Sequence, residues 1–146
     1  MSIRTILVPT DFSEHSNAAL DLAVDLAQPL SARLVLLHSY WVSISMAASI
    51  WVIPPDFMDR LGEAARSQLV VLQKRALDRG VRCDVHLTTR PVVEAILEAA
   101  AEVPAQLVAM GTHGHTGVKH VVLGSTAERI VRMAPCPVLT VKAPKE

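Results

Sequence analysis

The chain has 146 residues, of which 51% are hydrophobic, and its 14 lysine and arginine residues balance 14 aspartate and glutamate residues. This composition excludes a disordered chain, and the length is typical of one compact domain, which we expect over residues 1–146. A net charge of zero argues against a nucleic-acid partner, because such binders need a surplus of cations to displace counterions from phosphates.

The first third of the chain predicts a strand, a helix and a second strand. Residues 3–8 form a short apolar run that a proline ends, as is typical of a buried strand. Asp11 and Ser13 then offer N-cap oxygens to a helix that should run to about Leu30. A second apolar run, at residues 34–38, predicts the next strand.

The middle of the chain predicts a long helix and a half-exposed strand. The helix begins at Asp56 and is stopped by Gly80, because glycine readily adopts the left-handed backbone that ends helices. Residues 81–88 then alternate apolar and polar side chains, which favours a strand at an edge of a sheet. Cys83 lies on the apolar side of that alternation, so we expect an unreactive core cysteine.

The last third of the chain predicts two more helices and two more strands. Pro91 suits the first turn of a helix, because an N–H group at that position would have no acceptor within the helix. Ser125 and Glu128 have the spacing of a capping box, which would open another helix. The expected elements are a helix over 92–102, a strand over 107–110, a helix over 125–134 and a strand over 137–141.

Strands that alternate with helices predict an α/β fold. We expect a single doubly wound domain with a five-stranded parallel sheet and helices on both faces. The first, second and fourth strands are almost entirely apolar, as are strands that helices cover on both sides. These three strands therefore belong at the centre of the sheet.

The longest uncharged run, residues 34–55, has the length of a membrane span but not its composition. His38 and several serines interrupt it, so we interpret it as a strand followed by an apolar loop. The first residues lack the apolar core of a signal peptide, and two cysteines are too few for a disulfide framework. We therefore expect a cytoplasmic protein with no membrane partner.

Four of the six glycines fall within fourteen residues, between the fourth strand and the helix that follows. They are Gly111, Gly114, Gly117 and Gly124, and Ser125 comes next. Glycines let backbone N–H groups approach phosphate oxygens, and a helix N-terminus adds unpaired donors. The alternative is an ordinary loop, but open α/β sheets bind ligands at the carboxyl ends of their strands. The segment therefore predicts an anion site.

The glycine spacing is that of neither the Walker motif nor the dinucleotide-binding fingerprint. It reads G-x2-G-x9-G-S and resembles the nucleotide-binding signature of the universal stress protein family, in its ATP-binding branch. Residues 6–13 resemble the opening strand and turn of that family, residues 36–38 its second strand, and residues 124–142 its last helix and strand. The similarity covers most of the chain and is weak over residues 39–60.

This resemblance implies strand order 3-2-1-4-5, with ATP, or AMP or ADP, between the first and fourth strands. Asp11 would face the ribose or the base, although an Asp before a helix can also be a plain N-cap. The Ser39 backbone would meet the adenine edge, and the glycines would hold the phosphates. The implied binding residues are Pro9, Thr10, Asp11, Ser39, Met110, Gly111, Gly114, His115, Gly124, Ser125 and Thr126.

The histidines of the glycine-rich segment raise the question of a metal site. His113, His115 and His120 lie within eight residues, and imidazole is a good zinc ligand. No cysteine or carboxylate has the spacing that would complete a ligand set, so we expect no protein-held metal and no catalytic triad. A magnesium ion would arrive with the phosphates of the nucleotide.

Two segments predict partners. Residues 41–53 are strongly apolar and would form a protein-binding surface, a lid over the nucleotide, or a loop packed on its own domain. The strand at 137–141 would form an apolar edge of the sheet, which pairing with the same strand of a second subunit would cover. The resemblance implies the same pairing, so we expect a two-fold homodimer.

Three functions fit these observations. The first is a stress-response regulatory protein in which bound ATP acts as a switch. The second is a slow magnesium-dependent ATPase or phosphotransferase at the same site. The third is a structural dimer whose crevice stays empty. The sequence offers no evident general base, which favours the switch.

Overall fold

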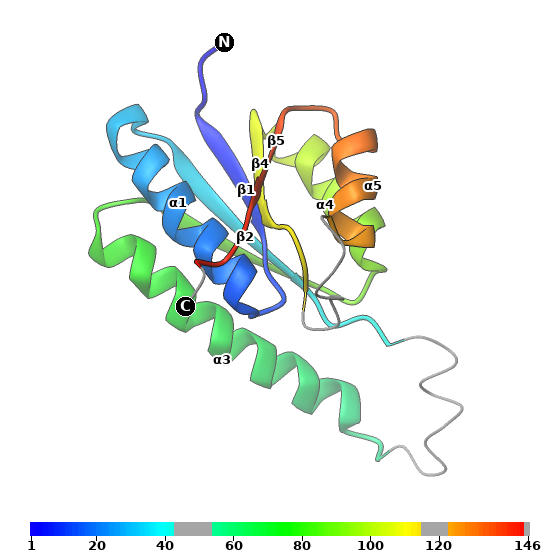
Figure 1. Cartoon of the computed structure of the whole chain (residues 1–146). Coiled ribbons are helices and arrows are strands. Elements are labelled where there is room, and N and C mark those ends of the chain that lie inside the picture. Colours follow the sequence, from blue (N-terminus) through cyan, green and yellow to red (C-terminus); the bar gives the residue numbers. More distant parts are fainter. Residues whose placement is uncertain (43–53, 115–122, 145–146) are drawn as a thin grey trace.

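The computed structural model describes residues 1–42, 54–114 and 123–144. Within them, five parallel strands form one sheet in the order β3-β2-β1-β4-β5, so the predicted fold is confirmed (Figure 1). The elements are β1 Thr5–Pro9, α1 Glu14–Leu30, β2 Arg33–Ser39, α3 Phe57–Asp78, β3 Cys83–Thr88, α4 Val92–Glu102, β4 Leu107–Gly111, α5 Ser125–Met133 and β5 Val138–Val141.

The alternation of side chains along each central strand builds two separate cores. Ile6 and Val8 of β1 pack with α1 and α3 on one face of the sheet. Leu7, between them, packs with α4 and α5 on the other face. Every residue of β1 is buried, which explains why the strand is apolar throughout.

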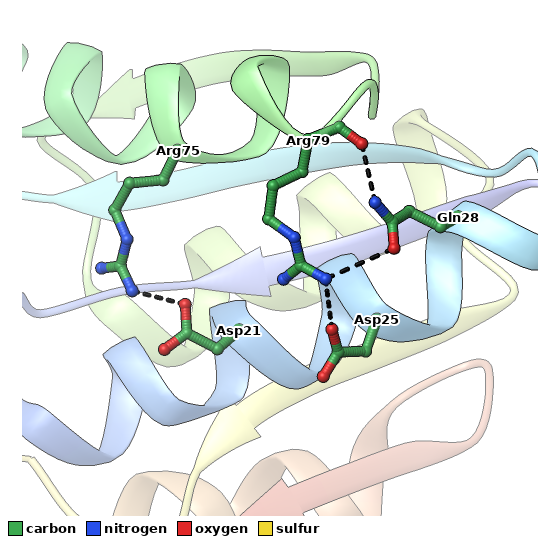
Figure 2. A network of polar contacts seen from close by, with 5 residues as sticks. All are labelled: Asp21, Asp25, Gln28, Arg75 and Arg79. Carbon is green, nitrogen blue, oxygen red and sulfur yellow. Dashed lines mark hydrogen bonds and ion pairs between the residues drawn. The ribbon is translucent and has the colours of Figure 1, made fainter.

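Polar contacts hold α3 beside α1 on their shared face, as Figure 2 shows. Arg79 donates to Asp25 at 2.5 Å, and the Gln28 side-chain amide donates to the Arg79 carbonyl at 2.7 Å. One turn away, Arg75 pairs with Asp21. The charged side chains are about half exposed, so this network orients the two helices more than it stabilises them.

The N-terminus of α5 corrects the predicted capping box. Gly124, not Ser125, is the N-cap, and Ser125 is the first helical residue. The Glu128 N–H donates to the Gly124 carbonyl, while the Glu128 carboxylate pairs with Arg132 at 2.6 Å. The Ser125 hydroxyl lies inside the helix rather than at its N-cap, and among the described residues no side chain makes a capping hydrogen bond there, so the capping-box prediction is wrong.

Other element boundaries move by one or two residues. The first strand begins at Thr5 rather than Ile3, because its pairing with β2 begins at the Thr5–Arg33 register. Ser13 is the N-cap of α1, and its side chain accepts from the Ser16 N–H. Gly80 follows α3 with a φ of 77°, the left-handed conformation expected of a helix stop.

The predicted apolar segment at 41–53 lies largely outside the described residues. Trp41, at its beginning, is 46% exposed. Whether the segment forms a lid, a partner surface or a packed loop therefore stays a prediction. Within the described parts of the chain, no helix is long and apolar enough to cross a membrane.

Cys83 should resist alkylation in the folded protein. Burial, and secondarily the charge of Asp84, raises the pKa of its thiol to about 12, so almost no thiolate forms near neutral pH. Cys136 is partly exposed, and burial raises the pKa of its thiol less. With iodoacetamide at pH 8, mass spectrometry should find Cys136 modified first and Cys83 only after denaturation. Equal rates in the native protein would contradict the burial of Cys83.

Candidate functional site

A cavity of about 640 Å³ opens at the carboxyl ends of β1 and β4. The connections from these neighbouring strands run to opposite faces of the sheet, which is where open α/β folds bind ligands. Every predicted binding residue within the described chain lines this cavity, and His115 lies outside the described residues. The predicted residues that line it are Pro9, Thr10, Asp11, Ser39, Met110, Gly111, Gly114, Gly124, Ser125 and Thr126.

The turn after β1 forms one wall, and its own side chains hold it in place. The Thr10 N–H donates to the Leu37 carbonyl at 2.8 Å, and its hydroxyl accepts from the Phe12 N–H at 3.0 Å. Phe12 adopts a left-handed φ of 65°, which turns the chain sharply towards α1. His38 Nδ1 donates to the Thr10 carbonyl at 2.7 Å, which joins this turn to the end of β2.

Asp11 stands between the two halves of the site. Its Oδ1 accepts from the Ser13 N–H at 3.0 Å, and Ser13 itself caps α1, so Asp11 is not the N-cap. Its Oδ2 lies against Gly114, where a Cβ atom would come within 2.4 Å of it. The carboxylate therefore links the β1 turn to the glycine-rich segment.

The end of β4 forms the opposite wall and lies directly on α1. A Cβ atom on Gly111 would stand 2.8 Å from the backbone carbon of His15 and 2.9 Å from the nitrogen of Ser16. Such distances are far inside van der Waals contact, so only glycine fits here. The glycine that the sequence links to phosphate binding is thus also required for packing.

Thr112 and Gly124 bring α5 to the cavity. The Gly124 N–H donates to the Thr112 carbonyl at 2.7 Å. This bond holds the start of α5 against residues 111–114, which we call the glycine-rich wall of the cavity. Gly124 has no side chain to cap the helix, and the next three N–H groups have no acceptor within it. Ser125, Thr126 and Ala127 carry these groups, and all three line the cavity. This arrangement suits an anion.

The far wall comes from α4 and from the end of β2. The Ser39 hydroxyl donates to the Arg90 carbonyl, and the Tyr40 N–H donates to the Thr88 carbonyl at 3.0 Å. These bonds hold the turn before α4 against β2. Apolar side chains of α4 then face the cavity, although the sequence predicts only a buried helix face for this segment. They are Val92, Ala95 and Ile96.

The charge of the lining limits what the cavity can hold unaided. Among the described lining residues, Asp11 and Glu128 are carboxylates and none is a lysine or arginine. A phosphate here would therefore meet backbone N–H groups and would need a cation to offset the carboxylates. His38 and His113 also line the cavity, but the described residues form no group of three metal-ligating side chains.

Comparisons with known proteins agree with this fold. The model of the universal stress protein family matches residues 2–142. Universal stress protein MJ0531 of Methanocaldococcus jannaschii is 32% identical over 98% of this chain and 84% of that protein. The solved structure of MJ0577, from the same organism, has a TM-score of 0.87 and 26% identity and covers 100% of both chains.

A solved universal stress protein in complex with cAMP shares the fold, with a TM-score of 0.72 and 24% identity. It covers 99% of this chain and 100% of that one.

Proposed function

The chain belongs to the universal stress protein family, and on that basis we propose that it binds ATP between β1 and β4 and acts as a ligand-dependent regulatory protein. The phosphates lie at the glycine-rich wall and at the start of α5. The adenosine lies towards Asp11, Ser39 and Met110. The cAMP in a solved relative is an adenine nucleotide too, which supports the ligand class.

The observation that carries this proposal is the start of α5. Three N–H groups without helical acceptors open into a cavity of about 640 Å³, and the positive end of the helix dipole points the same way. The apolar face of α4 and the side chain of Met110 supply the other half of the site, since a purine base needs apolar contacts on its faces.

Removing magnesium should weaken ATP binding at least about tenfold, because the described lining of the cavity carries two carboxylates and no lysine or arginine to offset the charge of the phosphates. Isothermal titration with and without EDTA measures the change. AMP, with a single phosphate, is the matched ligand and should lose less affinity. An ATP affinity that EDTA leaves unchanged would contradict the role of the ion.

Binding and turnover are distinguished by one assay. The purified protein is incubated with ATP and magnesium, and the products are separated by chromatography. The switch proposal expects ATP to be retained at one per chain without ADP accumulating. Steady release of ADP would instead support the slow ATPase or phosphotransferase. If no adenine nucleotide binds, the chain is a structural protein with an empty crevice.

The homodimer rests on β5. This strand lies at an edge of the sheet, and each of its residues is partly exposed. Antiparallel pairing with β5 of a second copy would satisfy the unpaired backbone groups of that edge. Sedimentation at micromolar concentration should give twice the mass of the chain, and a monomer at that concentration would overturn the pairing.

A further inference from the structure

Thr112 is a junction between the cavity and the segment that follows β5. It is only 3% exposed, and all of its polar groups are engaged. Its N–H donates to the Val141 carbonyl at 2.9 Å, and its carbonyl accepts from the Gly124 N–H at 2.7 Å. Its hydroxyl lies 3.0 Å from Nδ1 of His113 and 3.4 Å from Nδ1 of His15. A ligand that fixes the glycine-rich wall therefore also fixes Thr112.

His15 extends this junction to the chain beyond β5. It lies in the first turn of α1, and its Nδ1 accepts from the Ala143 N–H at 2.9 Å. Its backbone and Cβ are the surface on which Gly111 packs. His15 thus contacts both the wall of the cavity and the segment at 142–144, which are distant from it in sequence.

The hydrogen bond from Ala143 assigns the position of the ring proton of His15. Because Ala143 can only donate, Nδ1 of His15 carries no proton, and the ring proton is on Nε2. The one lone pair of Nδ1 accepts from Ala143 at 2.9 Å, so the Thr112 hydroxyl at 3.4 Å is the weaker of its two neighbours. Side-chain nitrogen NMR measures the tautomer of His15 directly.

We propose that His15 is a positioning residue that couples nucleotide binding in the cavity to the ordering of the segment after β5. The coupling rests on the proposed function, since the nucleotide is its ligand. Phosphates bound at Gly114 and at the start of α5 hold Thr112, and Thr112 with His15 holds Val141 and Ala143. Nucleotide binding stabilises the ordered segment by some factor, and by linkage the ordered segment strengthens nucleotide binding by the same factor. Loss of the His15 contact should therefore weaken binding by that factor.

Amide hydrogen exchange of Ala143, measured by NMR with and without ATP and magnesium, tests the coupling. In the wild type, ATP should slow this exchange about fivefold or more. The amide of Gly80 is the internal control. It donates a hydrogen bond to the Leu77 carbonyl at the end of α3, far from the cavity, so ATP should leave its exchange unchanged. In His15→Phe, the effect of ATP on Ala143 should vanish, and ATP should bind about fivefold more weakly.

His15→Asn is the matched variant, because its side-chain oxygen can accept a hydrogen bond near the position of Nδ1. In this variant ATP should again slow the exchange of the Ala143 amide. If the His15 ring served only for packing, asparagine would not restore that effect. ATP binding without slower exchange at Ala143, or a wild-type His15 protonated on Nδ1, would overturn the coupling alone. Absence of ATP binding to the wild type would overturn the proposed function and the coupling together, and titration calorimetry identifies that case.

Discussion

Gly111→Ala should lower the free energy of unfolding by about 2–3 kcal/mol, as overpacking at a rigid contact does. The new Cβ would lie 2.8 Å from the backbone carbon of His15 and 2.9 Å from the nitrogen of Ser16. Both belong to the first turn of α1, which cannot yield without breaking its cap. Urea denaturation followed by circular dichroism measures the loss.

Gly62→Ala is the matched control for this substitution. Gly62 lies within α3, and the nearest atom to its Cβ would be the hydroxyl of Tyr40 at 3.2 Å, the end of a side chain that can move. Alanine is favoured over glycine in a helix by about 0.5–1 kcal/mol, so this variant should be as stable as the wild type or more so. Equal effects of the two substitutions would show that β4 does not pack on α1 as described.

Gly114→Ala should weaken ATP binding at least about tenfold, equivalent to about 1.4 kcal/mol, with little loss of stability. Its Cβ would come within 2.4 Å of Oδ2 of Asp11, so the carboxylate or the glycine-rich wall must move. Gly114 is exposed and lies outside the strands and helices, so the fold should tolerate the shift. Titration calorimetry and thermal melting measure the two effects separately.

A double-mutant cycle with Asp11→Ala identifies the cause. If the collision with the carboxylate is what harms binding, Gly114→Ala should cost much less in the Asp11→Ala background than in the wild type. Losses of affinity that simply add would mean that Gly114 acts without Asp11, for example through its own N–H. Asp11→Ala alone should also weaken binding, because the carboxylate faces the proposed ribose position.

Much of the fold could be predicted because its signals are local. An apolar run, a helix cap such as Ser13 and a helix stop such as Gly80 can each be recognised within a few residues of sequence. The alternation of strands and helices then restricts the topology of the sheet. The sequence predicts the start of α5 one residue too late. The local pattern fits Ser125 either as the N-cap or as the first helical residue, and the structure has the second arrangement. The bond from Gly124 to Thr112, a contact between separate elements, fixes this arrangement.

The site could be predicted only in part, for the same physical reason. The glycine spacing predicts an anion site, because glycines before a helix start let backbone N–H groups approach phosphate oxygens. That Gly111 packs on His15, however, depends on a contact across 96 positions of the chain, which a local pattern does not contain. The α4 wall is similar, since Val92 and Ile96 read only as a helix face until the sheet places them beside β1 and β4.

Native mass spectrometry tests the central claim most directly. The protein, freed of any ligand, is mixed with equimolar ATP and magnesium and sprayed under non-denaturing conditions. We predict a mass increase of one ATP per chain in the wild type, strongly reduced in Gly114→Ala. A wild-type spectrum that shows only the mass of the unliganded chain would contradict nucleotide binding between β1 and β4.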